Sequence, residues 1–482
     1  MRLPCLAVLF AATALGALKP EDVIPSSLKP FVPPATEARG ELSKTLTDYM
    51  ATPAAEVKAH PAAKEFPGSV DSPDRVARKV AYDANLIHRW DTSAGNAPNL
   101  ATGPEVWQET GLYAAPGEVV TVKAASLPDF RIVRIVIGCH RDKLFKLDKW
   151  SRFPLINRSF DLQVGETKVA NAFGGQIFIM VQNGPLASKR TAPGKPTVIG
   201  NFSLDFSNAV AASTYVLGKD TLATWKETLK SPAPWATLVT KNVILHVRTA
   251  QLLKLEDPQP LLEWWDKVLG LEDDLIALQR LAPERVVPDI QISAGFMHSG
   301  YPFMCQLKAS EKEIFDLEGL KKKGNWGFFH ELGHNHQRTD WTFTGQTEVT
   351  CNLFSLYVME KLVGMPTGQG HGAMKNLEQL MSQRLATPAN MGFFEQLAPF
   401  VALVKAHGWE PLRATLRSYA DQPVKGDEAS RKNIFVVRYG QFAKADVSDF
   451  FGKLGYPITP ETKAALMGFP GYTYAPTPPA SK

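Results

Sequence analysis

Apolar and polar residues alternate in short runs from residue 107 to about 206. β-Branched residues dominate these runs, and Pro-Gly, Val-Gly-Glu and Gly-Gly breaks separate them, a spacing typical of a β-sandwich. The pattern predicts strands over residues 118–123, 131–137, 160–164 and 176–182. Aromatic residues are scattered here, so we favour a structural role in which this domain supports a neighbouring one. A sugar-binding module is the alternative.

From about residue 210 the apolar positions recur at helical spacing instead. Apolar stripes predict helices over 258–278 and 412–420, and the adjacent Trp264 and Trp265 are more typical of a core than of a binding surface. Residues 289–293 alternate, which predicts an edge strand of a small sheet. Such an edge could hold a substrate peptide by main-chain hydrogen bonds, or be an ordinary strand.

These patterns predict an α+β chain of several domains. The sandwich domain spans residues 105–209, and a mainly helical domain with a small sheet spans 210–482. Ahead of them, residues 18–104 are rich in proline and alanine, and we expect a linker with helices at 41–50 and 75–90. We assign no chemistry to this segment.

Residues 1–17 resemble a secretory signal peptide. They hold one positive charge at Arg2, a short apolar run and small residues near their end. That run is too short to span a bilayer, and no later run approaches about 20 apolar residues. We therefore expect a secreted, periplasmic or cell-surface protein without a membrane span.

Composition excludes few function classes. The 53 basic and 48 acidic residues give a net charge of +5, and no basic cluster is longer than residues 321–323, which argues against a nucleic-acid surface. Beyond the signal segment the cysteines are Cys139, Cys305 and Cys351, which can form one disulfide at most. For Cys351 we favour a buried thiol or a bridge to Cys305 over metal binding. We expect a monomer.

The candidate chemistry lies in a His-Glu-Leu-Gly-His run that begins at His330. At 100° per residue, His334 lies about 40° from His330 on the same helix face, with Glu331 beside them at about 100°. Two histidines one turn apart can bind one ion, and the glutamate is placed to act as a general base. His336 falls at about 240°, on the far side of the helix, which makes it a poor ligand.

A catalytic zinc ion needs a third protein ligand and one open position for water. Glu348 is the best candidate, because a second helix is expected to start near residue 347 and can turn its first turn back toward the histidines. The expected site therefore holds Zn²⁺ between two imidazoles and one carboxylate. Glu331 would take a proton from water and later give it to the leaving amine.

The segments 325–337 and 345–357 closely resemble the peptidase M60 (enhancin-like) family of zinc metallopeptidases. The likeness extends to 107–119, 137–140, 174–179 and 289–302. It implies a zincin-type catalytic domain after a β-rich half. Members cleave glycoproteins, and several are mucin-directed proteases that require an O-glycan beside the scissile bond. The resemblance thus implies an O-glycosylated, mucin-type protein as substrate.

The family resemblance also suggests substrate contacts. Trp326 lies one turn before His330, where it could stack on a sugar or wall the pocket, and glycan-recognising members have a tryptophan at the matching position. Arg438 is similar to a family arginine that contacts the sugar. Val349 departs from the pattern, since some members carry an acidic residue there.

Three questions stay open at this point. Tyr301, His298 and Tyr439 are all candidates for the residue that stabilises the oxyanion. A broad-specificity secreted metalloprotease without glycan dependence is the main alternative function. A glycan-binding or channel-associated protein is the second alternative, although relatives of that kind tend to have a degraded zinc motif and the motif here is complete.

Overall fold

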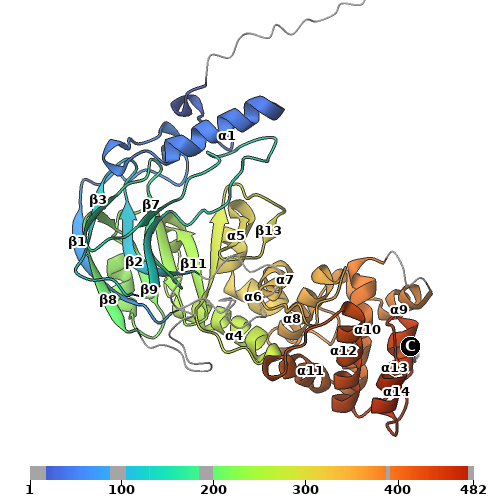
Figure 1. Cartoon of the computed structure of the whole chain (residues 1–482). Helices are drawn as coiled ribbons and strands as arrows, with labels where there is room; N and C mark the ends of the chain where they lie inside the picture. The colour runs from blue at the N-terminus through green and yellow to red at the C-terminus, as the bar shows by residue number, and fades with distance from the viewer. Residues whose placement is uncertain (1–17, 87–104, 130, 184–198, 387–390, 476–482) are drawn as a thin grey trace, which may run out of the picture.

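A computed structural model describes residues 18–86, 105–129, 131–183, 199–386 and 391–475. A β-sandwich lies at one end of the molecule, a smaller sheet with helices in the middle, and a group of helices at the other end (Figure 1). The expected signal peptide falls outside the described residues. Within these ranges no helix combines the length and apolarity needed to cross a bilayer.

The sandwich is a single antiparallel sheet that folds over on itself, in the order β5-β4-β7-β2-β8-β3-β6 with β1 also on β8. The long strand β8 joins the two layers, because Val210 and Ala211 pair with β2 while earlier residues pair with β1 and β3. Aliphatic side chains from both layers share one core. The described strands are β1 (Val76–Asp83), β2 (Val106–Ala114), β3 (Val120–Ala124), β4 (Arg131–Ile137), β5 (Arg158–Asp161), β6 (Gly165–Val169), β7 (Gly175–Asn183) and β8 (Asn201–Ala211).

Most predicted strands of the sandwich are confirmed, and two predictions need correction. The strand expected at 160–164 is confirmed only at residues 160 and 161, which end β5, and residues 162–164 form the turn before β6. The helix expected at 75–90 is wrong, because residues 76–83 form β1 and place Val80 and Tyr82 in the sandwich core at a spacing of two. Helical composition misled the prediction; positions 87–90 lie outside the described residues. The helix expected at 41–50 is confirmed within α1 (Thr36–Met50).

The middle of the molecule is a mixed sheet in the order β13-β14-β12-β11-β10-β9. The edge strand expected at 289–293 is wrong. The strand there is β12, which ends at Asp289, is wholly buried and pairs in parallel with both neighbours, so the edge on this side is β13. The bounds are β9 (Thr214–Val216), β10 (Trp235–Val239), β11 (Val243–Arg248), β12 (Glu284–Asp289), β13 (Met297–His298) and β14 (Phe303–Gln306).

Two buried arginines fasten the sandwich to this sheet. Arg152, from the loop before β5, forms an ion pair with Asp289 at 2.7 Å, and the two side chains are 1% and 0% exposed. Arg285 on β12 pairs with Glu109 on β2 and donates to the Trp107 carbonyl at 2.7 Å. Removing one partner would leave a buried unpaired charge, so both contacts hold the domains in a fixed arrangement.

Helices surround the middle sheet and form the far end of the molecule (Figure 1). The predicted helices at 258–278 and 412–420 are confirmed as α4 and α11, and Trp264 and Trp265 are buried in the core as expected. The described helices after α1 are α2 (Leu222–Thr228), α3 (Thr249–Leu252), α4 (Gln259–Ile276), α5 (Leu307–Phe315), α6 (Leu317–Lys323), α7 (Trp326–His334), α8 (Thr347–Lys361), α9 (Leu377–Ala386), α10 (Phe393–His407), α11 (Glu410–Asp421), α12 (Glu428–Ala443), α13 (Ser448–Lys453) and α14 (Pro460–Leu466).

Candidate metal centre

Helices α7 and α8 pack directly against each other and carry the predicted ligands. Helix α7 begins after Asn325, whose side chain accepts a hydrogen bond from the Phe328 amide at 3.1 Å. Gly333 allows the two helices to approach closely, because a Cβ atom there would lie 2.4 Å from the Cys351 carbonyl oxygen. This contact brings the last turn of α7 to the first two turns of α8.

The ligand atoms predicted from the sequence converge on one point. His330 Nε2 lies 3.1 Å from His334 Nε2 and 3.1 Å from a Glu348 carboxylate oxygen, and His334 Nε2 lies 3.4 Å from that oxygen. Two nitrogens at the usual distance from a tetrahedral zinc ion are about 3.3 Å apart. The donor types and their separations therefore fit a zinc-type ion with three protein ligands.

Side-chain amides fix the tautomers of both histidines. His330 Nδ1 lies 2.7 Å from Asn352 Oδ1, and His334 Nδ1 lies 2.9 Å from Gln337 Oε1. The Asn352 amide nitrogen donates to the Glu348 carbonyl, and the Gln337 amide nitrogen donates to the Thr347 carbonyl, both at the start of α8. Each amide oxygen must therefore face an imidazole. Both Nδ1 atoms therefore carry the proton, and both Nε2 lone pairs are available to a metal ion.

Cys351 lies behind the His330 ring. Its Sγ is 3.5 Å from His330 Nδ1 and 3.9 Å from Nε2, so it is nearer to the protonated nitrogen than to the lone pair. Burial raises the pKa of this thiol well above its usual range. Cys139, Cys305 and Cys351 are all buried free thiols, so the buried-thiol prediction is confirmed and the bridge to Cys305 is wrong.

Glu331 occupies the position expected of a general base, one residue from His330 and off the ligand stripe. Burial, helped by the negative charge of Glu348, raises its pKa to about 7, against the opposing effects of His334 and of a hydrogen bond from the Ser299 backbone. A carboxylate with a pKa near neutrality is suited to both accepting and returning a proton at neutral pH.

His336 lies on the opposite side of this segment, as its helical angle predicted, and is fully buried. Its Nδ1 lies 2.7 Å from the Leu332 carbonyl oxygen and its Nε2 lies 2.9 Å from Asp273 Oδ1. Arg280 forms a second ion pair with Asp273 at 2.6 Å. Burial favours the neutral form of Asp273, but the His336 hydrogen bond and the Arg280 charge outweigh it and hold the pKa below its usual range.

Of the three oxyanion candidates, two point away from the metal cluster. Tyr301 is 3% exposed, and its hydroxyl accepts a hydrogen bond from the Trp107 amide at the domain interface. Tyr439 is buried among the C-terminal helices, where its hydroxyl donates to the Leu403 carbonyl. His298 remains, half-buried on β13, with its charge interacting with that of Glu331.

The two predicted substrate contacts lie in different surroundings. Trp326, at the start of α7, forms an aromatic wall with His371 and Phe394, at ring-centre distances of 5.0 and 6.4 Å. Arg438 lies on α12, and its guanidinium donates to Ser418 on α11 and to the carbonyl of Gln422 just after that helix. The structure thus places Trp326 beside the metal cluster and engages Arg438 elsewhere.

Comparison with known protein families supports a metal site at this cluster. The family model for peptidase M60, enhancin and enhancin-like proteins matches residues 208–455, and a model for the N-terminal domain of M60-like peptidases matches residues 83–191. The chain belongs to the peptidase M60 family. Family membership implies a metal ion, and the donor cluster is formed by His330, His334 and Glu348 with Cys351 nearby.

Among curated proteins, TRPM8 channel-associated factor 2 of Bos taurus is 34% identical over 405 residues, covering 80% of this chain. This chain spans only 42% of that relative. Among solved structures, the ZmpB metallopeptidase of Clostridium perfringens matches with a TM-score of 0.58 at 16% identity, covering 82% of each chain. The M60 catalytic domain of ZmpC from the same organism, in complex with the sialyl T antigen, matches with a TM-score of 0.57 at 14% identity, over 82% of this chain and 80% of that one. These structural matches establish the M60 fold.

Several site residues were not found from the sequence. Asn352 lies one helical turn after Glu348, and that spacing could have suggested a partner for one of the histidines. Gln337 follows His334 by three residues, and that spacing could likewise have suggested a partner for this histidine. His371 and Phe394 carry no such signal, because only the packing of α10 and the segment before α9 brings them to Trp326.

Proposed function

We propose that this chain is a zinc-dependent endopeptidase. The observation that carries the proposal is the cluster of His330, His334 and Glu348, whose separations match those of ligands around one tetrahedral ion. The fixed tautomers support it further, since an imidazole prepared for binding keeps its Nε2 lone pair free. Three protein ligands leave a fourth position for water or substrate, as in a catalytic site.

In the proposed reaction, zinc would supply the positive charge that polarises the scissile carbonyl and acidifies water. Glu331 takes the proton of the attacking water and delivers it to the amine nitrogen as the peptide bond breaks. The Ser299 amide hydrogen-bonds the Glu331 carboxylate and so keeps it oriented in the site. Both ring nitrogens of His298 are bonded, to Asp142 and to the Ser299 carbonyl, so this side chain would stabilise negative charge on the carbonyl oxygen through its positive charge and not through a hydrogen bond.

The proposed substrate is an O-glycosylated, mucin-type protein, cleaved beside a glycosylated serine or threonine. Two observations support it: the aromatic wall of Trp326, His371 and Phe394 next to the cluster, and the sialyl T antigen bound by a structurally similar M60 domain. Residues 1–17 have the composition of a secretory signal, so we propose that the protein acts outside the cytoplasm.

The test is cleavage of an O-glycosylated mucin-domain protein, with fragments mapped by mass spectrometry before and after enzymatic removal of the glycans. We expect cuts beside glycosylated residues that disappear after deglycosylation. Cuts that persist would indicate a general metalloprotease. The Glu331→Gln variant should fold and bind zinc while turnover falls by about 10²–10⁴-fold, and near-normal turnover of that variant would refute the general-base assignment.

A non-catalytic binding role is the second candidate, since the curated relative is named a TRPM8 channel-associated factor. An intact set of ligands and a poised glutamate favour an enzyme. No zinc-dependent cleavage of either form of the mucin-domain protein would favour the binding role.

A further inference from the structure

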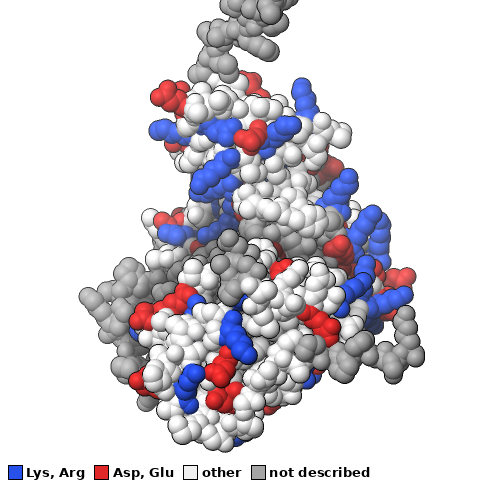
Figure 2. Space-filling view, turned by 90° about the vertical axis from the view of Figure 1, so that its right-hand side faces the viewer, with Lys and Arg blue, Asp and Glu red and all other residues white. Residues whose placement is uncertain are grey.

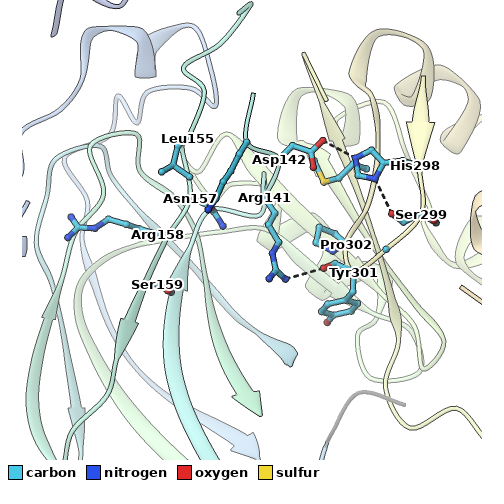
Figure 3. A pocket seen from close by; sticks show the side chains of 13 residues that line it. Arg141, Asp142, Leu155, Asn157, Arg158, Ser159, His298, Ser299, Tyr301 and Pro302 are labelled. Atoms are coloured by element: carbon cyan, nitrogen blue, oxygen red, sulfur yellow. Dashed lines mark hydrogen bonds and ion pairs between the residues drawn. The ribbon is translucent and has the colours of Figure 1, made fainter. Parts of the chain in front are cut away.

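A cleft of about 490 Å³ lies between the sandwich and the catalytic domain. One wall comes from the sandwich and includes Arg141, Lys143 and Asn157, and the other is the catalytic segment from His298 to Met304. Figure 3 shows the two walls facing each other across the cleft. Its volume lies within the roughly 300–1,000 Å³ of pockets that hold small ligands or short peptide segments.

Both walls are held rigidly. Asp142, at the start of the sandwich wall, accepts from His298 Nε2 at 2.9 Å, a contact that joins the two walls (Figure 3), and from the Ser293 amide at 2.6 Å. Arg152 donates to the Asp142 carbonyl at 3.0 Å while paired with the buried Asp289. The cleft is therefore preformed, and a ligand need not order its walls.

The cleft adjoins the proposed catalytic residues. Ser299 lines it, and the Ser299 amide also hydrogen-bonds Glu331. The next residue, Gly300, exchanges two hydrogen bonds of 3.0 Å with the Asn335 side chain at the end of α7. Through Ser299, the cleft therefore borders Glu331.

The lining leaves particular groups available to a ligand. Arg141 is paired with Glu105 and donates to the Tyr301 carbonyl, and Arg158 donates to the carbonyls of Ala170 in the sandwich and Thr52 after α1. Asp142 is occupied by His298. By contrast, the Lys143 ammonium and the Asn157 amide form no hydrogen bond or ion pair with the residues that the structure describes. Figure 2 shows Lys and Arg side chains gathered in the recess below the upper end of the molecule.

We propose that this cleft binds the substrate polypeptide next to the scissile bond and favours an acidic group there, through Lys143 with Asn157 as a hydrogen-bonding partner. The sandwich would then determine specificity in addition to buttressing the enzyme. This inference rests on the proposed peptidase function. The acidic group can be an Asp or Glu side chain or an acidic sugar on the glycan, which share the carboxylate that a lysine recognises.

The test uses synthetic peptides with one O-glycosylated threonine and Asp, Ala or Lys within three residues on either side. For the full chain with zinc, we expect kcat/KM to be about two- to fivefold higher for Asp than for Lys peptides, mainly through KM. Lys143→Glu should reverse this order. The matched variant Lys146→Glu changes a nearby exposed lysine outside the lining and should leave the order unchanged.

Two further arms separate the possible outcomes. Peptides with a neutral or a sialylated glycan show which source supplies the acidic group, and dependence on either one supports the cleft. Binding of the same peptides to the Glu331→Gln protein, measured by calorimetry, tests the cleft even if no peptide is cleaved. The inference would be overturned if Lys143→Glu left the order of the Asp, Ala and Lys peptides unchanged in binding and cleavage, or if Lys146→Glu changed that order equally. The proposed peptidase function could still stand in either case.

Discussion

The two sides of the α7 segment present histidines in contrasting surroundings. On one side, His330 and His334 each have one ring nitrogen bonded to an amide oxygen and the other directed at Glu348. On the other side, both ring nitrogens of His336 have protein partners, the Leu332 carbonyl and Asp273. The residue type is the same and the positions lie within seven residues of one another, so the surroundings alone distinguish them.

The difference shows what makes a histidine a candidate ligand. A metal needs a neutral imidazole with a fixed tautomer and an unused lone pair, and His330 and His334 satisfy these conditions. His336 has no lone pair to offer, because both of its ring nitrogens face acceptor oxygens, those of Leu332 and Asp273, and donate protons to them. Burial favours this saturated arrangement, since an unbonded polar atom there would be costly.

The largest effect should come from removing a ligand. The His334→Ala variant should lose its stoichiometric zinc on dialysis, because two remaining ligands cannot hold the ion against buffer. Metal content by inductively coupled plasma mass spectrometry is the measurement. Retention of one zinc ion per chain in this variant would show that the three-residue cluster is not the metal site.

A smaller effect should come from Asn352→Ala, which leaves all three ligands and removes the acceptor of the His330 Nδ1 proton. We expect zinc affinity to fall by about 10–100-fold, because the ring loses its fixed tautomer and orientation. Competition with a chelator of known affinity measures the change. Asn352→Asp keeps an oxygen acceptor and should lose less; an equal loss in both variants would indicate a packing effect.

The His336→Ala variant should have the smallest effect on zinc content and the largest effect on the stability of the fold. Zinc content should be unchanged, while the free energy of unfolding should fall by about 2–4 kcal/mol because Asp273 loses a buried partner. The pKa of Asp273 is lowered in the folded protein, so its contribution is present above its unfolded pKa and lost as pH falls. Urea unfolding at pH 7 and at lower pH tests both statements, and zinc loss without destabilisation would contradict them.

Much of the fold could be predicted from the sequence where the apolar pattern is strong. The α4 stripe and the β-branched run of β4 give clear periods, and both elements occur as expected. The prediction failed at β1, whose overall composition suggested a helix although Val80 and Tyr82 alternate. It failed again at residues 289–293, because pairing with β11 and β14 determines which short apolar run becomes the strand.

The identity and spacing of the candidate ligands could be predicted from the amino-acid sequence. Helical geometry places His330 and His334 on one face, because they are one turn apart within α7. The tertiary structure was needed to find Asn352 as the partner of His330, to eliminate Tyr301 and Tyr439, and to find the cleft beside Glu331. Those features depend on contacts between segments far apart in sequence, such as Asp142 with His298, for which local periodicity contains no information.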